Sequence, residues 1–134
     1  EHHPGIIKTG FLPDPVAHYH LMDIFVFLTK REGFGNVSIE AALCGLPVVA
    51  SDVTGARNTI VDGKTGVLVD PRNLQEITET LEDFIASENL RVRFGEAGRQ
   101  WASAHFSNEV LWKELDSFYK NCLSESLVPT GELN

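Results

Sequence analysis

Two carboxylates and the turn between them are the residues of this sequence best suited to bind a ligand. Glu32 and Glu40 lie eight positions apart, with Gly33 and Gly35 in the turn that separates them. Glycine permits close backbone approach, and the first N–H groups of a helix starting near residue 35 would point outward with its positive dipole end, an arrangement that suits a diphosphate. Carboxylates are unfavourable beside phosphates, but each can accept two hydrogen bonds from a vicinal diol. The pattern is therefore consistent with a nucleotide-sugar site.

A purely structural interpretation of the same residues stays open at this point. A lone Gly-x-Gly before a helix is a weak motif, and Glu40 could be a solvated helix residue near a favourable dipole end. Residue types and spacing alone do not decide between the two interpretations.

The elements that would position this turn alternate along the first 70 residues. Strands are predicted at residues 6–9, 24–28, 47–51 and 66–69, with helices at about 15–22, 36–44 and 56–61 between them. The continuous apolar run at 24–28 is typical of a strand buried on both faces, and Gly45 suits a left-handed helix end. Short connections then predict an α/β fold, a Rossmann-like parallel sheet with helices on both faces. Ligands of such sheets bind beyond the carboxyl ends of the strands, where the turn lies.

Three more helices are predicted after the last strand, without further strands. Asn73, Ser87 and Ser107 are suited to cap them. Each helix carries an apolar stripe at helical spacing, which predicts packing against the core rather than a ligand cradle. The aromatic residues considered for both roles are Trp101, Trp112 and Tyr119. We predict one domain over residues 1–123 and a flexible tail over 124–134, where periodicity ends.

Composition excludes several classes of protein. The 134 residues include 11 basic and 19 acidic side chains, for a formal charge of −8, which argues against a nucleic-acid partner. No run approaches the ~20 apolar residues that span a bilayer, and the first residues do not resemble a leader peptide. Cys44 and Cys122 are expected to be reduced core residues, as in a cytoplasmic protein.

The motif and its surroundings resemble the retaining glycosyltransferases of family 4, which have the two-domain GT-B fold. The resemblance is carried by Glu32-Gly-Phe-Gly-Asn-Val-Ser-Ile-Glu40, by Ala41-Ala-Leu-Cys-Gly-Leu-Pro-Val-Val-Ala-Ser-Asp-Val-Thr-Gly55 and by Ile60-Val-Asp-Gly-Lys-Thr-Gly-Val-Leu-Val69. It extends from about Ile6 to Cys122. The Glu-x7-Glu pattern with an internal Gly-x-Gly is specific in this context. The variant seen here is most similar to bacterial members that build capsular polysaccharide, O-antigen or lipid-linked oligosaccharides.

The resemblance implies that this chain is the C-terminal, donor-binding domain of such an enzyme. Glu32 would contact hydroxyls of the transferred sugar as the catalytic residue, backbone N–H groups from Phe34 to Val37 would hold the diphosphate and the sugar, and Glu40 would bind the ribose diol. Phe11 and Leu12 would lie near the nucleobase, with core packing an equal alternative for Phe11. The donor-binding set implied in this way is Gly33, Phe34, Gly35, Asn36, Val37, Glu40, Phe11 and Leu12.

The expected reaction is transfer of a hexose or N-acetylhexosamine from a nucleotide sugar, with UDP as the favoured nucleotide and with retained configuration. Neither a metal nor a cofactor is expected. The acceptor would be a glycan or a polyprenyl-diphosphate-linked glycan, held by an N-terminal domain that this chain lacks. The complete enzyme would then be cytoplasmic, at the inner face of the cell membrane, with peripheral membrane association.

One departure from the family pattern concerns the donor phosphates. The family places an Arg and, five residues on, a Lys against them from a segment upstream of Ile6, so this chain alone is expected to bind weakly and to be inactive. Lys30 and Arg31 are expected to be exposed charges beside the turn, with a phosphate contact as the alternative, and Arg57 could reach an acceptor or a phosphate. A non-catalytic nucleotide-sugar-binding module remains the alternative function.

Overall fold

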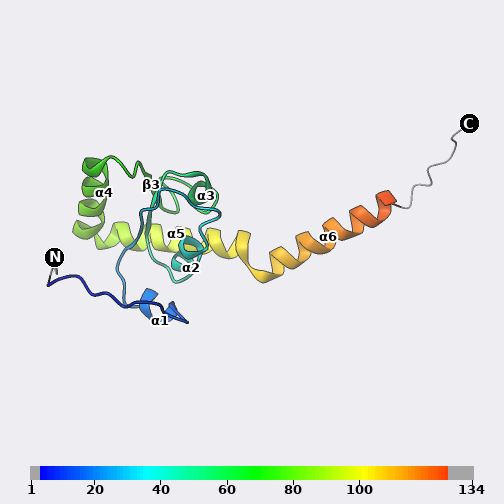
Figure 1. Ribbon diagram of the computed structural model, residues 1–134, viewed down its shortest axis with the longest axis horizontal. Coiled ribbons are helices and arrows are strands. Elements are labelled where there is room, and N and C mark those ends of the chain that lie inside the picture. The colour runs from blue at the N-terminus through cyan, green and yellow to red at the C-terminus, as the bar shows by residue number, and fades with distance from the viewer. Residues whose placement is uncertain (1–3, 127–134) are drawn as a thin grey trace, which may run out of the picture.

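The computed structural model describes residues 4–126, which form a three-stranded parallel sheet and six helices. The helices lie around the sheet except for the last one, which extends away from it (Figure 1). In chain order the elements are α1 (Val16–Tyr19), β1 (Phe25–Phe27), α2 (Asn36–Leu43), β2 (Val48–Ser51), α3 (Thr54–Arg57), β3 (Val67–Val69), α4 (Leu74–Ala86), α5 (Glu88–Phe106) and α6 (Asn108–Ser126).

The sheet has the order β1-β2-β3, so β2 is its central strand. Val49 of β2 is in register with Val26 on one side and with Val67 on the other. All four residues of β2 are buried, as a central strand of a covered parallel sheet requires. The predicted parallel sheet is confirmed here. The apolar run at 24–28, however, predicts a strand buried on both faces and instead forms the shorter edge strand β1, in which Val26 is 40% exposed.

Both faces of the sheet are covered, because side chains alternate along β2. Val48 and Ala50 join a cluster with residues of α2 and with Ala102 of α5. Val49 joins a second cluster with Phe84 of α4 and residues of β3 and α5. The long helix α5 therefore contributes to both cores. This is the predicted α/β class, with helices on both faces of the sheet and three helices after it.

The predicted helix ends are also confirmed. The side chain of Asn73 accepts a hydrogen bond from Glu76 N at 3.2 Å, and Ser87 Oγ accepts one from Leu90 N at 3.2 Å. Ser107 Oγ accepts a longer one, 3.4 Å, from Val110 N. Gly45, at the end of α2, has the left-handed φ of 80° that favours glycine.

The strand predicted at residues 6–9 is wrong. Ile7 is 88% exposed, and no strand among the described residues pairs with the outer edge of β1. A strand is stabilised by ladder hydrogen bonds to a neighbour, so an apolar run without a partner does not become one.

Two of the predicted helices are shorter than expected. The first ends at Tyr19 because Leu21 N and Met22 N bond three residues back, in tighter turns. The helix predicted at 56–61 is instead α3, which begins at Thr54 and ends at Arg57. Both the backbone N and the Oγ1 of Thr59 donate to Ala56 O, which closes that helix.

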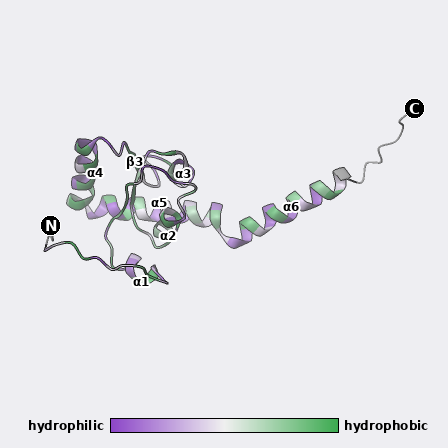
Figure 2. Ribbon diagram, viewed as in Figure 1, coloured by the Kyte–Doolittle hydropathy of each residue, from purple (hydrophilic) through white to green (hydrophobic). Residues whose placement is uncertain are grey.

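The prediction that α6 packs against the core is wrong. Trp112 and Tyr119 are 68% and 59% exposed, and Cys122 is exposed as well, whereas Trp101 of α5 does pack against the core. Hydrophobic and hydrophilic residues both face solvent along this helix (Figure 2). It also continues to Ser126, three residues past the predicted domain boundary, and residues 127–134 lie outside the described residues.

Candidate functional site

The loop between β1 and α2 folds around the carboxylate of Glu32. One oxygen, Oε1, accepts hydrogen bonds from the N–H groups of Gly33, Phe34 and Gly35 at 3.0, 3.3 and 3.0 Å. Three converging backbone donors form a concave nest for an anion. Oε2 of Glu32 accepts no hydrogen bond within residues 4–126. The loop therefore holds the carboxylate in one orientation and leaves one oxygen available.

Helix α2 begins directly after this nest. Gly35 is its N-cap residue and has a left-handed φ of 85°, which L side chains rarely adopt. The N–H groups of Asn36 and Val37, the first two of the helix, donate to no acceptor in the described part of the chain. Of the N–H groups predicted to hold the donor, those of Phe34 and Gly35 thus bond Glu32, while those of Asn36 and Val37 remain for a ligand.

The loop rests on α3 and on the residues that follow it. A Cβ on Gly55 would lie 2.5 Å from the carbonyl oxygen of Glu32, so only glycine allows the first turn of α3 to approach so closely. The side chain of Thr59, which is 2% exposed, lies beneath Gly35. These contacts fix the position of the Glu32 loop against α3 and Thr59.

Glu40 is an exposed residue one turn into α2, and its carboxylate has a partner from α1. Tyr19 Oη donates a hydrogen bond to Glu40 Oε2 at 2.9 Å. Burial, together with this hydrogen bond and the negative charge of Glu40, raises the pKa of Tyr19 to about 12. Oε1 of Glu40 accepts no hydrogen bond in the part of the chain that the structure describes.

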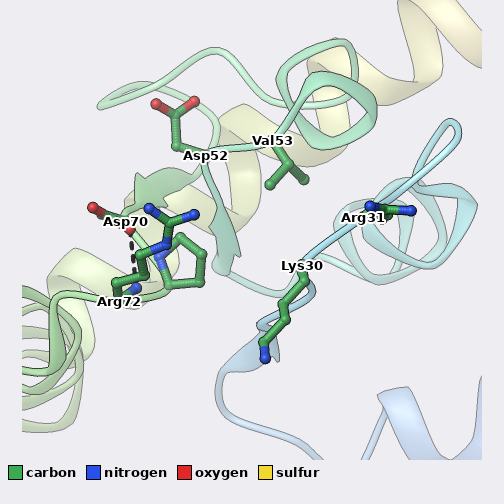
Figure 3. A pocket seen from close by; sticks show the side chains of 7 residues that line it. Lys30, Arg31, Asp52, Val53, Asp70 and Arg72 are labelled. Carbon is green, nitrogen blue, oxygen red and sulfur yellow. Dashed lines mark hydrogen bonds between the residues drawn. The ribbon is translucent and has the colours of Figure 1, made fainter.

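A cleft of about 570 Å³ opens at the carboxyl edge of the sheet. Its side chains come from the loops after all three strands, and Asp70 lies beside Arg72, whose N–H donates to Asp70 Oδ1 at 2.9 Å (Figure 3). This is the edge at which open parallel sheets bind ligands. The lining residues are Lys30, Arg31, Asp52, Val53, Asp70, Pro71 and Arg72.

A neighbouring cleft of about 410 Å³ places Glu32 next to both exposed basic residues of its loop, Lys30 and Arg31. Asp52 and Arg57 line it too and form a two-bond ion pair, with Arg57 Nη2 donating to Asp52 Oδ2 at 2.9 Å and Nε donating to Oδ1. These hydrogen bonds hold the pKa of Asp52 below its ordinary value. Arg57, predicted as a candidate for phosphate, therefore has an internal partner.

Glu40 lines a smaller cleft of about 180 Å³ on the other side of the loop. Phe34 and Phe106, with ring centroids 5.8 Å apart, form part of its wall. Of the predicted residues, Phe34, Asn36 and Glu40 line this cleft together, whereas Glu32 lines the neighbouring cleft of about 410 Å³. Phe11 is 90% exposed and Leu12 half-buried, and neither makes a hydrogen bond or a ring contact with that loop in residues 4–126, so their role near a nucleobase stays a prediction.

Among residues 4–126, no group of three or more His, Cys, Asp or Glu side chains is placed to hold a metal ion. No helix in the same stretch has both the length and the apolar character that crossing a bilayer requires.

Three residues of the site were missed by the sequence reasoning. Tyr19 fits an ordinary amphipathic turn, and its contact with Glu40 joins segments 21 positions apart. Thr59 carries no local pattern either. Gly55 could have been recognised from the sequence, because a glycine just after a strand and at a helix start indicates close backbone approach.

Comparisons with known proteins point to one family. The sequence model described as glycosyl transferases group 1 matches residues 3–101. The capsular polysaccharide biosynthesis glycosyltransferase CapM of Staphylococcus aureus is 42% identical over 123 residues, which cover 92% of this chain and 32% of that protein. A GDP-mannose-dependent alpha-(1-6)-phosphatidylinositol monomannoside mannosyltransferase of Mycolicibacterium smegmatis is 39% identical over 93 residues, which cover 64% of this chain and 24% of that protein.

A solved structure supports the same likeness. Anabaena Alr3699/HepE, in complex with UDP and glucose, superposes with a TM-score of 0.67 at 28% identity, over 75% of this chain and 29% of that one. The chain spans about a third or less of the length of these relatives.

Proposed function

This chain belongs to the glycosyl transferases group 1, with the Rossmann-like C-terminal half of a GT-B fold, and from that premise we propose that it binds the donor of a retaining transferase of family 4. The donor is a nucleoside diphosphate hexose or N-acetylhexosamine. The acceptor, a glycan or a polyprenyl-diphosphate-linked glycan, is bound by residues outside this chain. The product belongs to a cell-surface polysaccharide, as the similarity to CapM suggests.

The observation that carries this proposal is the pair of carboxylates on either side of the α2 N-terminus. Each has one oxygen held by a protein donor and one oxygen available: Glu32 through its own loop and Glu40 through Tyr19. Hydroxyl groups donate to carboxylate oxygens, so both glutamates suit sugar hydroxyls. From the family resemblance we propose that Glu32 binds the transferred sugar and Glu40 the ribose diol. The N–H groups of Asn36 and Val37, which lie between the two glutamates in the sequence at the start of α2, are proposed to bind the diphosphate.

The mechanism follows from where charge develops. As the glycosidic bond to the diphosphate breaks, negative charge grows on the leaving group, and the helix N-terminus stabilises it without reorganising. Glu32 orients the sugar through its hydroxyls. The acceptor hydroxyl then attacks the face that the leaving group vacates and gives its proton to the departing diphosphate oxygen, so the configuration is retained. No metal is proposed.

We propose UDP as the nucleotide, supported by the relative that is bound to UDP and glucose. A mannosyltransferase relative depends on GDP-mannose, so GDP sugars are the donors to compare. The enzyme acts in the cytoplasm, with its lipid-linked acceptor at the inner membrane face. This chain on its own is expected to be inactive, because the acceptor site and the cationic phosphate ligands of the family lie outside it.

The site assignment is tested by titrating the isotope-labelled chain with UDP-glucose, UDP-N-acetylglucosamine and GDP-mannose and following its amide resonances. We expect one of these donors to shift the signals of residues 33–40 and to bind about tenfold more weakly to a Glu40→Gln variant, which loses hydrogen bonds to a charged group. Glu96→Gln, on the exposed side of α5, is the matched control. Shifts confined to other residues would contradict the assignment.

A further inference from the structure

Among residues 4–126, Tyr19 is the one buried side chain that donates a hydrogen bond to a carboxylate of the proposed donor site. We propose that Tyr19 is a positioning residue for ribose recognition: its hydroxyl holds the Glu40 carboxylate in the orientation that accepts the ribose diol of the donor nucleotide. The inference rests on the proposed function and adds a residue to it.

The ring of Tyr19 is fixed before any ligand binds. It is 4% exposed and belongs to the core cluster that includes Ile39 and Ala42 of α2. It also packs edge-on against Phe25 of β1, with centroids 5.5 Å apart. A side chain enclosed in this way has few alternative rotamers, so its hydroxyl is a stationary donor.

Glu40, by contrast, is exposed and would move freely without this partner. A solvent-exposed glutamate samples many rotamers, and ordering it on ligand binding costs free energy. The hydrogen bond of 2.9 Å from Tyr19 Oη restricts that freedom in advance. Preorganisation of this kind increases affinity by reducing the ordering cost at the moment of binding.

The hydrogen-bonding capacity of the carboxylate allows both partners at once. An ionised carboxylate has about four lone-pair sites, and Tyr19 uses one of them on Oε2. Two hydroxyls of a ribose diol can occupy two of the others. Since Tyr19 also keeps its proton up to high pH, with a pKa of about 12, it remains a donor under all ordinary conditions.

The test measures discrimination between ribose and 2′-deoxyribose in the complete enzyme. Dissociation constants of UDP and 2′-deoxy-UDP, and of GDP and 2′-deoxy-GDP, are measured by calorimetry for the wild type, Tyr19→Phe, Glu40→Gln and the double variant. We expect the wild type to prefer the ribose form of its nucleotide by about tenfold or more. Tyr19→Phe should lower that preference by about threefold or more, because Glu40 loses its fixed orientation.

The double variant distinguishes a positioning role of Tyr19 from a packing role, because a positioning role makes the effects of the two substitutions on the ribose preference non-additive. If Tyr19 acts through Glu40, then removing its hydroxyl in the Glu40→Gln background changes the ribose preference no further. Tyr119→Phe removes a hydroxyl from an exposed tyrosine of α6 and should leave every constant unchanged. Thermal unfolding of each variant establishes that Tyr19→Phe, which keeps the buried ring, is folded.

The outcomes distinguish the two levels of the proposal. A ribose preference that depends on Glu40 but is the same in Tyr19→Phe would overturn the role of Tyr19 and leave the proposed function intact. Equal weakening of the ribose and deoxyribose forms in Tyr19→Phe would show a structural role only. If the wild type binds none of the four nucleotides, or binds them without regard to Glu40, the proposed donor site itself is wrong and the inference falls with it.

Discussion

Replacing Gly55 by alanine is expected to impair the proposed sugar transfer far more than it impairs folding. Gly55 is buried at the start of α3, where its Cα faces the backbone of the Glu32 loop. An added Cβ would lie 2.5 Å from Glu32 O, 2.7 Å from Glu32 C and 2.8 Å from Gly33 C. All three neighbours are backbone atoms, so no side-chain rotation can relieve the contact.

The size of the effect follows from these distances. Ordinary contacts of a Cβ begin at 3.4 Å, so the carbonyl oxygen of Glu32 must move by 3.4 − 2.5 = 0.9 Å. Overpacking of this kind costs about 1–3 kcal/mol of stability, which still leaves a domain of ordinary stability folded. A displacement of about 1 Å at a reacting group can lower the rate about 100-fold. We therefore expect kcat/KM of the complete enzyme to fall about 100-fold.

The assay follows nucleoside diphosphate release in the complete enzyme, alongside urea unfolding of each variant. Gly95→Ala and Gly98→Ala serve as controls, because their Cβ atoms would lie 2.0 Å from Gly45 O and 3.0 Å from Thr65 O, where α5 packs on other parts of the fold. They should lower stability without a matching loss of activity in the folded fraction. Gly55→Ala with wild-type kcat/KM, or with activity lost only in proportion to unfolding, would refute the reasoning.

Three further predictions concern stability. Phe84→Ala should lower the free energy of unfolding by about 3–5 kcal/mol in urea titrations, because Phe84 is 1% exposed, whereas Ile85→Ala, at a 70% exposed position, should change it little. Ser87→Ala removes the cap of α5 and should cost about 1 kcal/mol in the same assay. The pKa of Tyr19 is raised in the folded state from 10.0 to about 12, so its contribution to stability is complete below pH 10 and is lost as the pH rises towards 12. Unfolding measured from pH 9 to 12 should therefore show a steeper fall for the wild type than for Tyr19→Phe.

The parts of the fold that sequence patterns predict well are those whose cause is local. The parallel strands follow the predicted apolar segments, as Val48, Val49 and Ala50 do in β2, and Asn73 and Ser87 cap the helices that directly follow them. The candidate site is equally local, because Glu32 and the N–H groups that bind it lie within three residues of one another. The turn and its hydrogen bonds to Glu32 are thus set locally, while the ligand that the site binds stays a proposal.

The failures have a different physical origin, since each depends on a partner that a local pattern does not identify. The run at residues 6–9 has the composition of a strand, but Ile7 stays exposed without a neighbouring strand. The apolar stripe of α6 predicts that one face of the helix is buried, but it does not identify the element that covers that face. Phe118, on that stripe, is 61% exposed. Amphipathic periodicity is thus evidence for a helix and weaker evidence for its packing.

Tyr19 shows why the position of a site residue is harder to predict than its identity. In an amphipathic turn a tyrosine is accounted for by its ring, which is buried here beside Phe25, and the pattern would be the same for phenylalanine. What differs is one oxygen atom, whose hydrogen bond to Glu40 exists only because α1 and α2 meet in the folded chain. At Gly55 the missing atom matters instead: without a Cβ, α3 can approach the Glu32 backbone. The sequence motif thus supplies the two carboxylates; the local loop orients Glu32, whereas a hydrogen bond from the distant Tyr19 orients Glu40.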